Sequence, residues 1–206
     1  ITYLDHQLGR FLDYLDERGW RDDTLVVFAS DNGPVTESWI HWGEGNADGS
    51  TGGGRARKHF LYEGGIRVPA MMRWPGRIPA GTSASVTVGM DLFVTLARIG
   101  GAEVPTDRTI DGIDLQPLFA GEKLERTEPL VWALPSPDGK EFAYRDGDWK
   151  LLLSPAGAPL ALYHLGRDPL EMVDQLAAEP ERVARMQQGF DSWWQGLPSA
   201  SRQAAP

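Results

Sequence analysis

The sequence contains no cysteine in its 206 residues. Disulfides, cysteine-ligated zinc and a cysteine nucleophile are therefore excluded within these residues, and a bound metal would need oxygen or histidine ligands. Long apolar runs are missing too, because no stretch reaches the roughly 18 residues that a membrane-spanning helix needs. The first residues lack the basic-then-apolar pattern of a secretory signal. We expect no membrane partner, and the compartment, cytoplasmic or exported, stays open.

Positive charge is scarce as well, with 20 Lys and Arg against 29 Asp and Glu and a net charge of −9. Binding to nucleic acid depends on clustered basic residues that neutralise phosphates, so we expect no nucleic-acid partner. The hydrophobic fraction of 41% is enough for the core of one domain, or of a domain with a small appendage. The 24 glycines and 15 prolines are dispersed, which predicts many loops and no repeat.

The first half of the sequence predicts part of an α/β fold. Apolar residues at helical spacing indicate a helix over residues 1–18 that ends at Gly19. Residues 24–29 (T-L-V-V-F-A) have the pattern of a strand buried on both faces, which is typical of a parallel sheet. Residues 68–74 are a second strand candidate, and residues 90–99 indicate a short helix.

The second half predicts a smaller α+β subdomain. Its short apolar segments, separated by Pro, Gly and Asp, indicate an antiparallel sheet of strands near residues 129–134, 142–145, 149–153 and 160–164. Apolar residues then share one helical face from Pro180 to Trp194. We therefore predict an α/β part over residues 1–115, followed by an antiparallel sheet and a C-terminal helix over residues 116–206.

Two polar residues, Asp31 and Asn32, follow the first predicted strand in the stretch S-D-N-G-P. Ligands of α/β proteins bind beyond the carboxyl ends of the strands, and carboxylate and amide oxygens suit Ca²⁺ or Mg²⁺. The same residues are also favourable in an ordinary turn. Taken alone, this stretch leaves both a metal site and a turn open.

A basic cluster lies in a long glycine-rich stretch without periodicity, G-R-A-R-K-H-F-L-Y-E-G-G-I-R-V-P. Long loops of this kind inside a domain are usually functional or disordered. Arg55, Arg57, Lys58 and Arg67 concentrate positive charge in an acidic chain, as a site for a sulfate or phosphate group would require. The alternative is a solvated basic loop.

Several blocks in a fixed order resemble the C-terminal half of the type I sulfatases, which are arylsulfatase-like members of the alkaline-phosphatase superfamily. The blocks are S-D-N-G-P, K-x-x-x-Y-E-G-G-I-R-V-P, R-W-P-G-R-I, D-G-I-D-L-Q-P-L-F-A-G, G-D-W-K-L-L and L-Y-H-L-G-R-D-P-L-E. The resemblance extends over about residues 1–195. It implies a partial sulfatase-like sheet with helices and hydrolysis of a sulfuric or phosphoric ester.

The resemblance also implies roles for individual residues. Asp31 and Asn32 match two ligands of a divalent cation, which is calcium in this family. Lys58 matches the catalytic lysine that binds the substrate sulfate and stabilises the leaving oxygen, and Arg55 and Arg57 are expected to bind substrate beside it. The Glu-Gly-Gly segment and Arg67 of the same block are interpreted as supports of the loop.

Several parts of the family pattern are missing: the nucleophile, the early pair of aspartate metal ligands, the first lysine and the catalytic histidines. These sulfatases use a formylglycine made from the Cys or Ser of a C-x-P-x-R sequence, and neither version occurs here. His41 and His59 match no catalytic histidine, and a structural or surface role is favoured for each. If the chain acts alone, a metal-held water would attack a range of esters, which favours Zn²⁺ or Mn²⁺. The alternative is a remnant that binds metal or anions without catalysis.

Part of a sulfatase sheet would expose an apolar edge and face. We therefore expect a covering partner, either a missing N-terminal half or a second copy in a homo-oligomer. Light scattering that shows a monomer would contradict the second copy.

Overall fold

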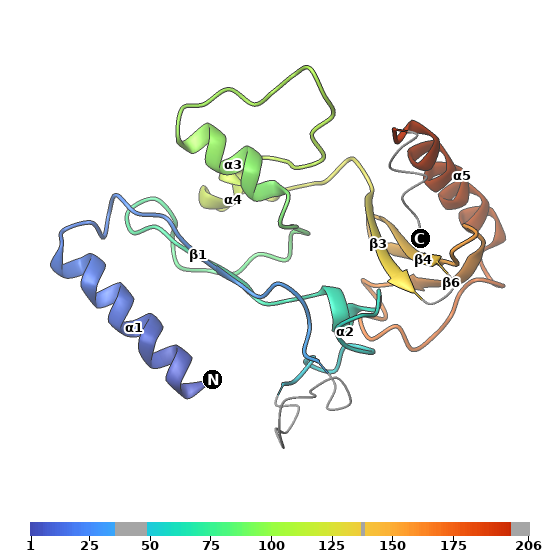
Figure 1. Ribbon diagram of the computed structural model, residues 1–206, viewed down its shortest axis with the longest axis horizontal. Coiled ribbons are helices and arrows are strands. Elements are labelled where there is room, and N and C mark those ends of the chain that lie inside the picture. The colour runs from blue at the N-terminus through green and yellow to red at the C-terminus, as the bar shows by residue number, and fades with distance from the viewer. Residues whose placement is uncertain (36–48, 137–138, 199–206) are drawn as a thin grey trace. The chain divides into compact units, whose positions relative to one another are not determined.

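The computed structural model describes residues 1–35, 49–136 and 139–198 (Figure 1). The helices are α1 (Thr2–Glu17), α2 (Glu63–Ile66), α3 (Asp91–Ile99), α4 (Gln116–Phe119) and α5 (Pro180–Gly196). The strands are β1 (Val26–Ala29), β2 (Ala70–Arg73), β3 (Leu130–Ser136), β4 (Gly139–Asp146), β5 (Trp149–Leu153) and β6 (Pro159–His164). The chain forms two compact units, one of residues 1–29 and 70–126 and the other of residues 30–69 and 127–206.

In the first unit, α1 ends where the sequence predicts. Gly19 has a φ of 72°, a left-handed conformation that favours glycine after a helix. Its N–H donates to the Asp16 carbonyl, and the Trp20 N–H donates to the Leu15 carbonyl, which satisfies two carbonyls at the end of the helix. The predicted helix over residues 90–99 is likewise confirmed as α3.

Strands β1 and β2 pair antiparallel, with Val26 opposite Arg73 and Ala29 opposite Ala70. The predicted parallel sheet, with this strand buried on both faces, is therefore wrong for the part of the chain that the structure describes: β1 is half-buried along Val26, Val27 and Phe28 and exposed at Ala29. The reason is topological. The loop between the strands returns the chain beside the same strand, so the two strands form a hairpin with a very long connection.

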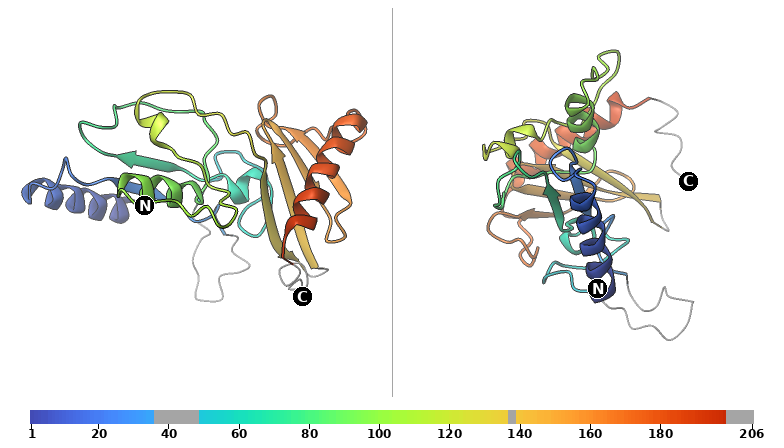
Figure 2. Two further views of the ribbon diagram at one scale, coloured as in Figure 1. Left: turned by 90° about the horizontal axis from the view of Figure 1, so that it is seen from above. Right: turned by 90° about the vertical axis from the view of Figure 1, so that its left-hand side faces the viewer.

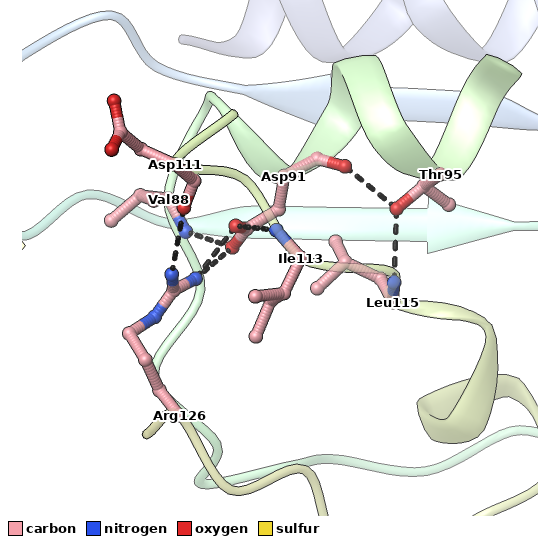
Figure 3. A network of polar contacts seen from close by, with 7 residues as sticks. All are labelled: Val88, Asp91, Thr95, Asp111, Ile113, Leu115 and Arg126. Atoms are coloured by element: carbon pink, nitrogen blue, oxygen red, sulfur yellow. Dashed lines mark hydrogen bonds and ion pairs between the residues drawn. The ribbon is translucent and has the colours of Figure 1, made fainter. Parts of the chain in front are cut away.

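Asp91, the first residue of α3, has a buried carboxylate that bonds to three other segments of the first unit (Figure 3). Its oxygens accept the N–H of Val88 at 2.8 Å and of Ile113 at 2.9 Å. Both oxygens also lie 2.6 Å from Nη2 of Arg126, whose side chain is only 8% exposed. One side chain thus joins the approach to α3 and two later segments.

The block D-G-I-D-L-Q-P packs against α3 for two further reasons. The Thr95 hydroxyl donates to the Asp91 carbonyl at 2.7 Å and accepts the Leu115 N–H at 2.9 Å (Figure 3). A Cβ at Gly112 would collide with the Met90 carbonyl oxygen, so only glycine allows this close approach. The block is therefore a structural element of the first unit.

The second unit contains a four-stranded sheet in the order β3-β4-β5-β6, with every pair antiparallel. The predicted strands are confirmed, and so is the predicted C-terminal helix as α5. Alternate residues point to opposite faces of a sheet. One face packs against α5 (Figure 2), with a core of Phe142, Tyr144, Leu151, Leu153, Leu162, Met186 and Phe190.

The opposite face of this sheet carries the segment that precedes α2. Its buried residues are Leu61, Ala143, Leu152, Ala161, Tyr163 and Leu165, with Tyr62 and Ile66 packed against them. The basic, glycine-rich loop is therefore supported by the C-terminal sheet. The mixed helix and sheet architecture agrees with the fold class that the sequence predicts.

Candidate functional site

The S-D-N-G-P and Y-E-G-G segments touch through their backbones. The Gly33 N–H donates to the Gly65 carbonyl at 2.9 Å. A Cβ at Gly33 would collide with the carbonyl oxygen of Gly64, so a larger residue cannot occupy this position without moving the backbone. Two motifs that lie far apart in the sequence are thus held in direct contact.

The second glycine contact closes the basic loop on itself. The Gly64 N–H donates to the Arg55 carbonyl at 2.8 Å. A Cβ at Gly64 would collide with the carbonyl oxygens of Arg55 and Ala56 and would lie 2.7 Å from that of Gly54. The Glu-Gly-Gly sequence therefore reflects backbone packing, as the interpretation of this segment as a loop support requires.

Lys58 lies beside the Asp-Asn-Gly-Pro segment because its own N–H donates to the Pro34 carbonyl at 2.9 Å. Ala56 and His59 near it have φ values of 59° and 74°, a left-handed conformation that costs energy for residues other than glycine. Such backbone strain is common at functional sites. Lys58 is half-buried, and His41 lies outside the described residues.

Asp31 and Asn32 form a compact turn immediately after β1. The Asn32 N–H donates to Oδ1 of Asp31 at 3.0 Å, and the Asn32 side-chain nitrogen donates to the Gly33 carbonyl at 2.9 Å. The Ser30 hydroxyl donates to the Asn32 carbonyl at 2.9 Å. The side-chain nitrogen of Asn32 is thus bonded to the main chain, and its side-chain oxygen is the atom of the type that coordinates a cation. Asp31 is exposed.

These two residues fit a hard divalent cation in kind but not in number. A carboxylate and an amide oxygen are suitable donors, and Ca²⁺ takes about six to eight oxygens. Within residues 1–35, 49–136 and 139–198, no group of three or more His, Cys, Asp or Glu side chains is placed to hold a metal. Cation binding by Asp31 and Asn32 therefore remains a prediction.

Arg55 connects the basic loop to the sheet. Its Nη1 donates to the Tyr163 hydroxyl and to the Glu171 carbonyl, both at 3.0 Å, and its guanidinium lies 4.2 Å from the centre of the Tyr62 ring. Burial, with a smaller contribution from Tyr62, raises the pKa of Tyr163 to about 12, so this hydroxyl stays protonated. Arg57 is exposed.

A buried ion cluster lies beneath the same loop. The Lys150 ammonium donates to Oε1 of Glu63 at 2.8 Å and to the Leu61 carbonyl at 3.0 Å. It also forms an ion pair with Oε1 of Glu171 at 2.6 Å. The second oxygen of Glu171 accepts the Glu63 N–H at 2.6 Å. The carboxylates therefore link the loop to β5 and to the turn after β6.

Sequence reasoning missed Lys150 and Glu171. The available signal was a lysine inside the apolar strand W-K-L-L-L, on the same face as Leu152 and hence facing the loop. A fully buried lysine needs a charged partner. Its partner Glu63 lies 87 positions away in the sequence, which no local pattern can reveal.

Two protein-family models match the chain. A sequence model described as "Sulfatase" matches residues 1–102, and one described as "N-sulphoglucosamine sulphohydrolase, C-terminal" matches residues 54–190. The chain belongs to the sulfatase family. The resemblance seen in its motifs is therefore confirmed.

Individual sulfatases extend this result. Steryl-sulfatase of Rattus norvegicus is 46% identical over 122 residues, which cover 59% of this chain and 21% of that protein. Human arylsulfatase A is 32% identical over 215 residues and covers 91% of this chain. The crystal structure of Ps i-CgsB matches with a TM-score of 0.73 and 27% identity over 92% of this chain. The chain spans only 41% of arylsulfatase A and 40% of Ps i-CgsB.

Among the described residues, no helix is both long and apolar enough to cross a membrane.

Proposed function

We propose that this chain is the part of a sulfuric ester hydrolase that supplies Lys58, Asp31 and Asn32 to the active site. The observation that carries the proposal is the hydrogen bond from the Lys58 N–H to the Pro34 carbonyl, which places the lysine next to the Asp-Asn-Gly segment. The membership in the sulfatase family supports it, since relatives are named steryl-sulfatase, arylsulfatase A and choline-sulfatase.

Each residue has a chemical role in this proposal. The Lys58 ammonium binds a sulfate oxygen and stabilises negative charge on the leaving oxygen. This stabilisation is stronger where water is partly excluded, because the local dielectric constant is lower. Asp31 and Asn32 would hold the divalent cation, calcium in this family, and the cation would supply further positive charge to the site. Arg57 is free to reach the substrate, whereas Arg55 acts mainly through its contacts with the sheet.

These residues supply no nucleophile of the family type. The 206 residues contain neither a cysteine nor an S-x-P-x-R sequence, so they encode no formylglycine of the family type. The contribution of this chain is therefore binding and charge stabilisation. A sulfate ester substrate and a partner that covers the exposed apolar residues of α1, such as Tyr3, Leu4 and Phe11, remain predictions.

Lys58→Ala tests the function. We expect kcat/KM for a chromogenic aryl sulfate to fall by about 10²–10³-fold, the effect of losing one group that stabilises an oxyanion. This activity assay and the others use the whole enzyme with Ca²⁺, that is, this chain together with the part that supplies the nucleophile. Lys123→Ala is the matched control, because Lys123 is 85% exposed and pairs only weakly with Glu125. Full activity in a folded Lys58→Ala protein would contradict the proposal. No turnover in the wild type, with or without Ca²⁺, Zn²⁺ or Mn²⁺, would favour the non-catalytic alternative.

Asp31→Ala tests the cation site. Loss of its carboxylate is expected to weaken Tb³⁺ or Ca²⁺ binding about tenfold or more, because affinity follows the number of charged ligands. Terbium luminescence measures this directly. Asp23→Ala, which removes another exposed carboxylate, is expected to leave binding unchanged. Equal affinities of the two variants would exclude Asp31 as a ligand.

A further inference from the structure

We propose that Lys150 and Glu171 are positioning residues that set the conformation of the loop carrying Lys58. The catalytic part of this inference rests on the proposed function, but the control of loop conformation does not. Neither residue belongs to a motif to which the sequence assigned a role in the site.

The Lys150 ammonium reaches acceptors on separate segments. It contacts the carbonyl of Leu61 at 3.0 Å and the carboxylate of Glu63 at 2.8 Å on the loop side, and Glu171 at 2.6 Å on the turn after β6. Lys150 and Glu171 are fully buried and Glu63 is 5% exposed. Each contact is short and shielded from water, so the segment from Leu61 to Glu63 has little freedom to move.

Glu171 also binds the loop through its main chain. Its carbonyl accepts a hydrogen bond from Nη1 of Arg55 at 3.0 Å, and its carboxylate accepts one from the Glu63 N–H at 2.6 Å. The residue has a φ of 57°, a left-handed conformation that is unfavourable for glutamate. This strained backbone directs the carbonyl and the carboxylate to two different loop residues. Glu171 therefore holds the loop at two positions, Arg55 and Glu63.

The fixed residues determine where Lys58 lies. The Gly64 N–H donates to the Arg55 carbonyl at 2.8 Å, and the Phe60 N–H donates to the Arg57 carbonyl at 3.1 Å. Lys58 lies inside both of these closed segments, residues 55–64 and residues 57–60. A shift of the segment held by Lys150 would therefore move the backbone of Lys58.

Stability alone does not account for this cluster. Buried charges lose their hydration, and well-packed apolar side chains in place of a buried ion network are often as stable or more stable. Here two carboxylates share one ammonium. Burial is the main cause of the raised pKa of Glu171, despite the opposing effect of Lys150. The cluster therefore has a large desolvation penalty. We infer that its role is to hold the loop in a single conformation.

The experiment is hydrogen–deuterium exchange of the whole chain in Glu171→Gln. An amide offers one acceptor and directs its NH₂ group at a donor, so it cannot serve both Lys150 and the Glu63 N–H. We expect exchange of residues 54–66 to rise about tenfold or more, while β4 and β5 keep their protection. Glu179→Gln is the matched control, because Glu179 is 40% exposed and pairs with Arg182 at the surface; its exchange should equal that of the wild type.

Glu171→Asp is a second variant in case the amide impairs folding. Aspartate keeps the charge and tolerates the left-handed conformation, but it is one methylene too short to reach both partners. The same increase in exchange within residues 54–66 is expected. Wild-type exchange of the loop in both variants would overturn the inference, and so would an equal loss of protection in β4 and β5, since that would show a general role in folding.

Activity separates positioning from a general structural role. Glu171→Gln is expected to lower kcat/KM for an aryl sulfate by about 10–100-fold, as small displacements of a reacting group can. If Glu171 acts through Lys58, the double variant Lys58→Ala/Glu171→Gln loses no more activity than Lys58→Ala alone. Additive losses would overturn the inference. A more mobile loop together with full activity of Lys58→Ala would instead refute the proposed function and leave the control of the loop intact.

Discussion

Gly64→Ala is expected to abolish measurable sulfate ester hydrolysis and to lower the free energy of unfolding of its unit by about 3 kcal/mol, the upper end of overpacking effects. The added methyl group would collide with the carbonyl oxygens of Arg55 and Ala56 and lie 2.7 Å from that of Gly54. All three are backbone atoms, so no side chain can rotate away. The loop must open, and the hydrogen bond from the Gly64 N–H to Arg55 is lost with it.

Gly196→Ala is the matched control for this prediction. Gly196 lies in the same unit, at the last position of α5, and a Cβ there meets nothing within 4 Å. We expect wild-type activity and a wild-type urea unfolding curve from this variant. A Gly64→Ala protein that matched it in both measurements would show that the glycine contacts do not define the loop.

Asp91→Ala is expected to destabilise the first unit by about 3–5 kcal/mol, the usual effect of removing one partner of a buried ion pair. The reason is that Arg126 would remain in a site where only 8% of its side chain is exposed, without its partner. The N–H groups of Val88 and Ile113 would lose their acceptor as well. Urea unfolding followed by tryptophan fluorescence measures the change, since Trp20 and Trp74 belong to this unit.

Asp107→Ala supplies the comparison for Asp91. Its carboxylate also pairs with an arginine, Arg108 at 2.8 Å, but both side chains are more than half exposed. Exposed ion pairs contribute little to stability, so no measurable shift of the unfolding midpoint is expected. If the two aspartate variants unfolded at the same urea concentration, the buried network would have no special role.

The local elements of this protein could be predicted because their signals are local. Gly19 after α1 and the spacing of apolar residues in α5 depend on neighbours within a few positions. The direction of β1 could not be predicted in this way. A buried-looking strand favours a parallel sheet, but its partner is set by where a long loop returns the chain.

The candidate site was predictable in part, for a similar reason. Asp31, Asn32 and Lys58 are predicted from their motifs. The hydrogen bonds that join the two motifs, such as the one from the Lys58 N–H to the Pro34 carbonyl, run between main-chain atoms. Side-chain patterns carry no information about such a bond. Glu171 was missed because its contact with Glu63 spans 108 positions.

The placement of the loop on the C-terminal sheet changes how sequence variants of such a chain should be weighed. Residues 127–206 contain none of the predicted metal or sulfate ligands. An assessment based on motifs alone would therefore predict a small loss of activity from substitutions there. Yet this segment supplies the lysine beneath the loop and the glutamate that grips it. A frameshift or premature stop after Arg126 would spare every predicted ligand and still remove the sheet that supports the loop carrying Lys58.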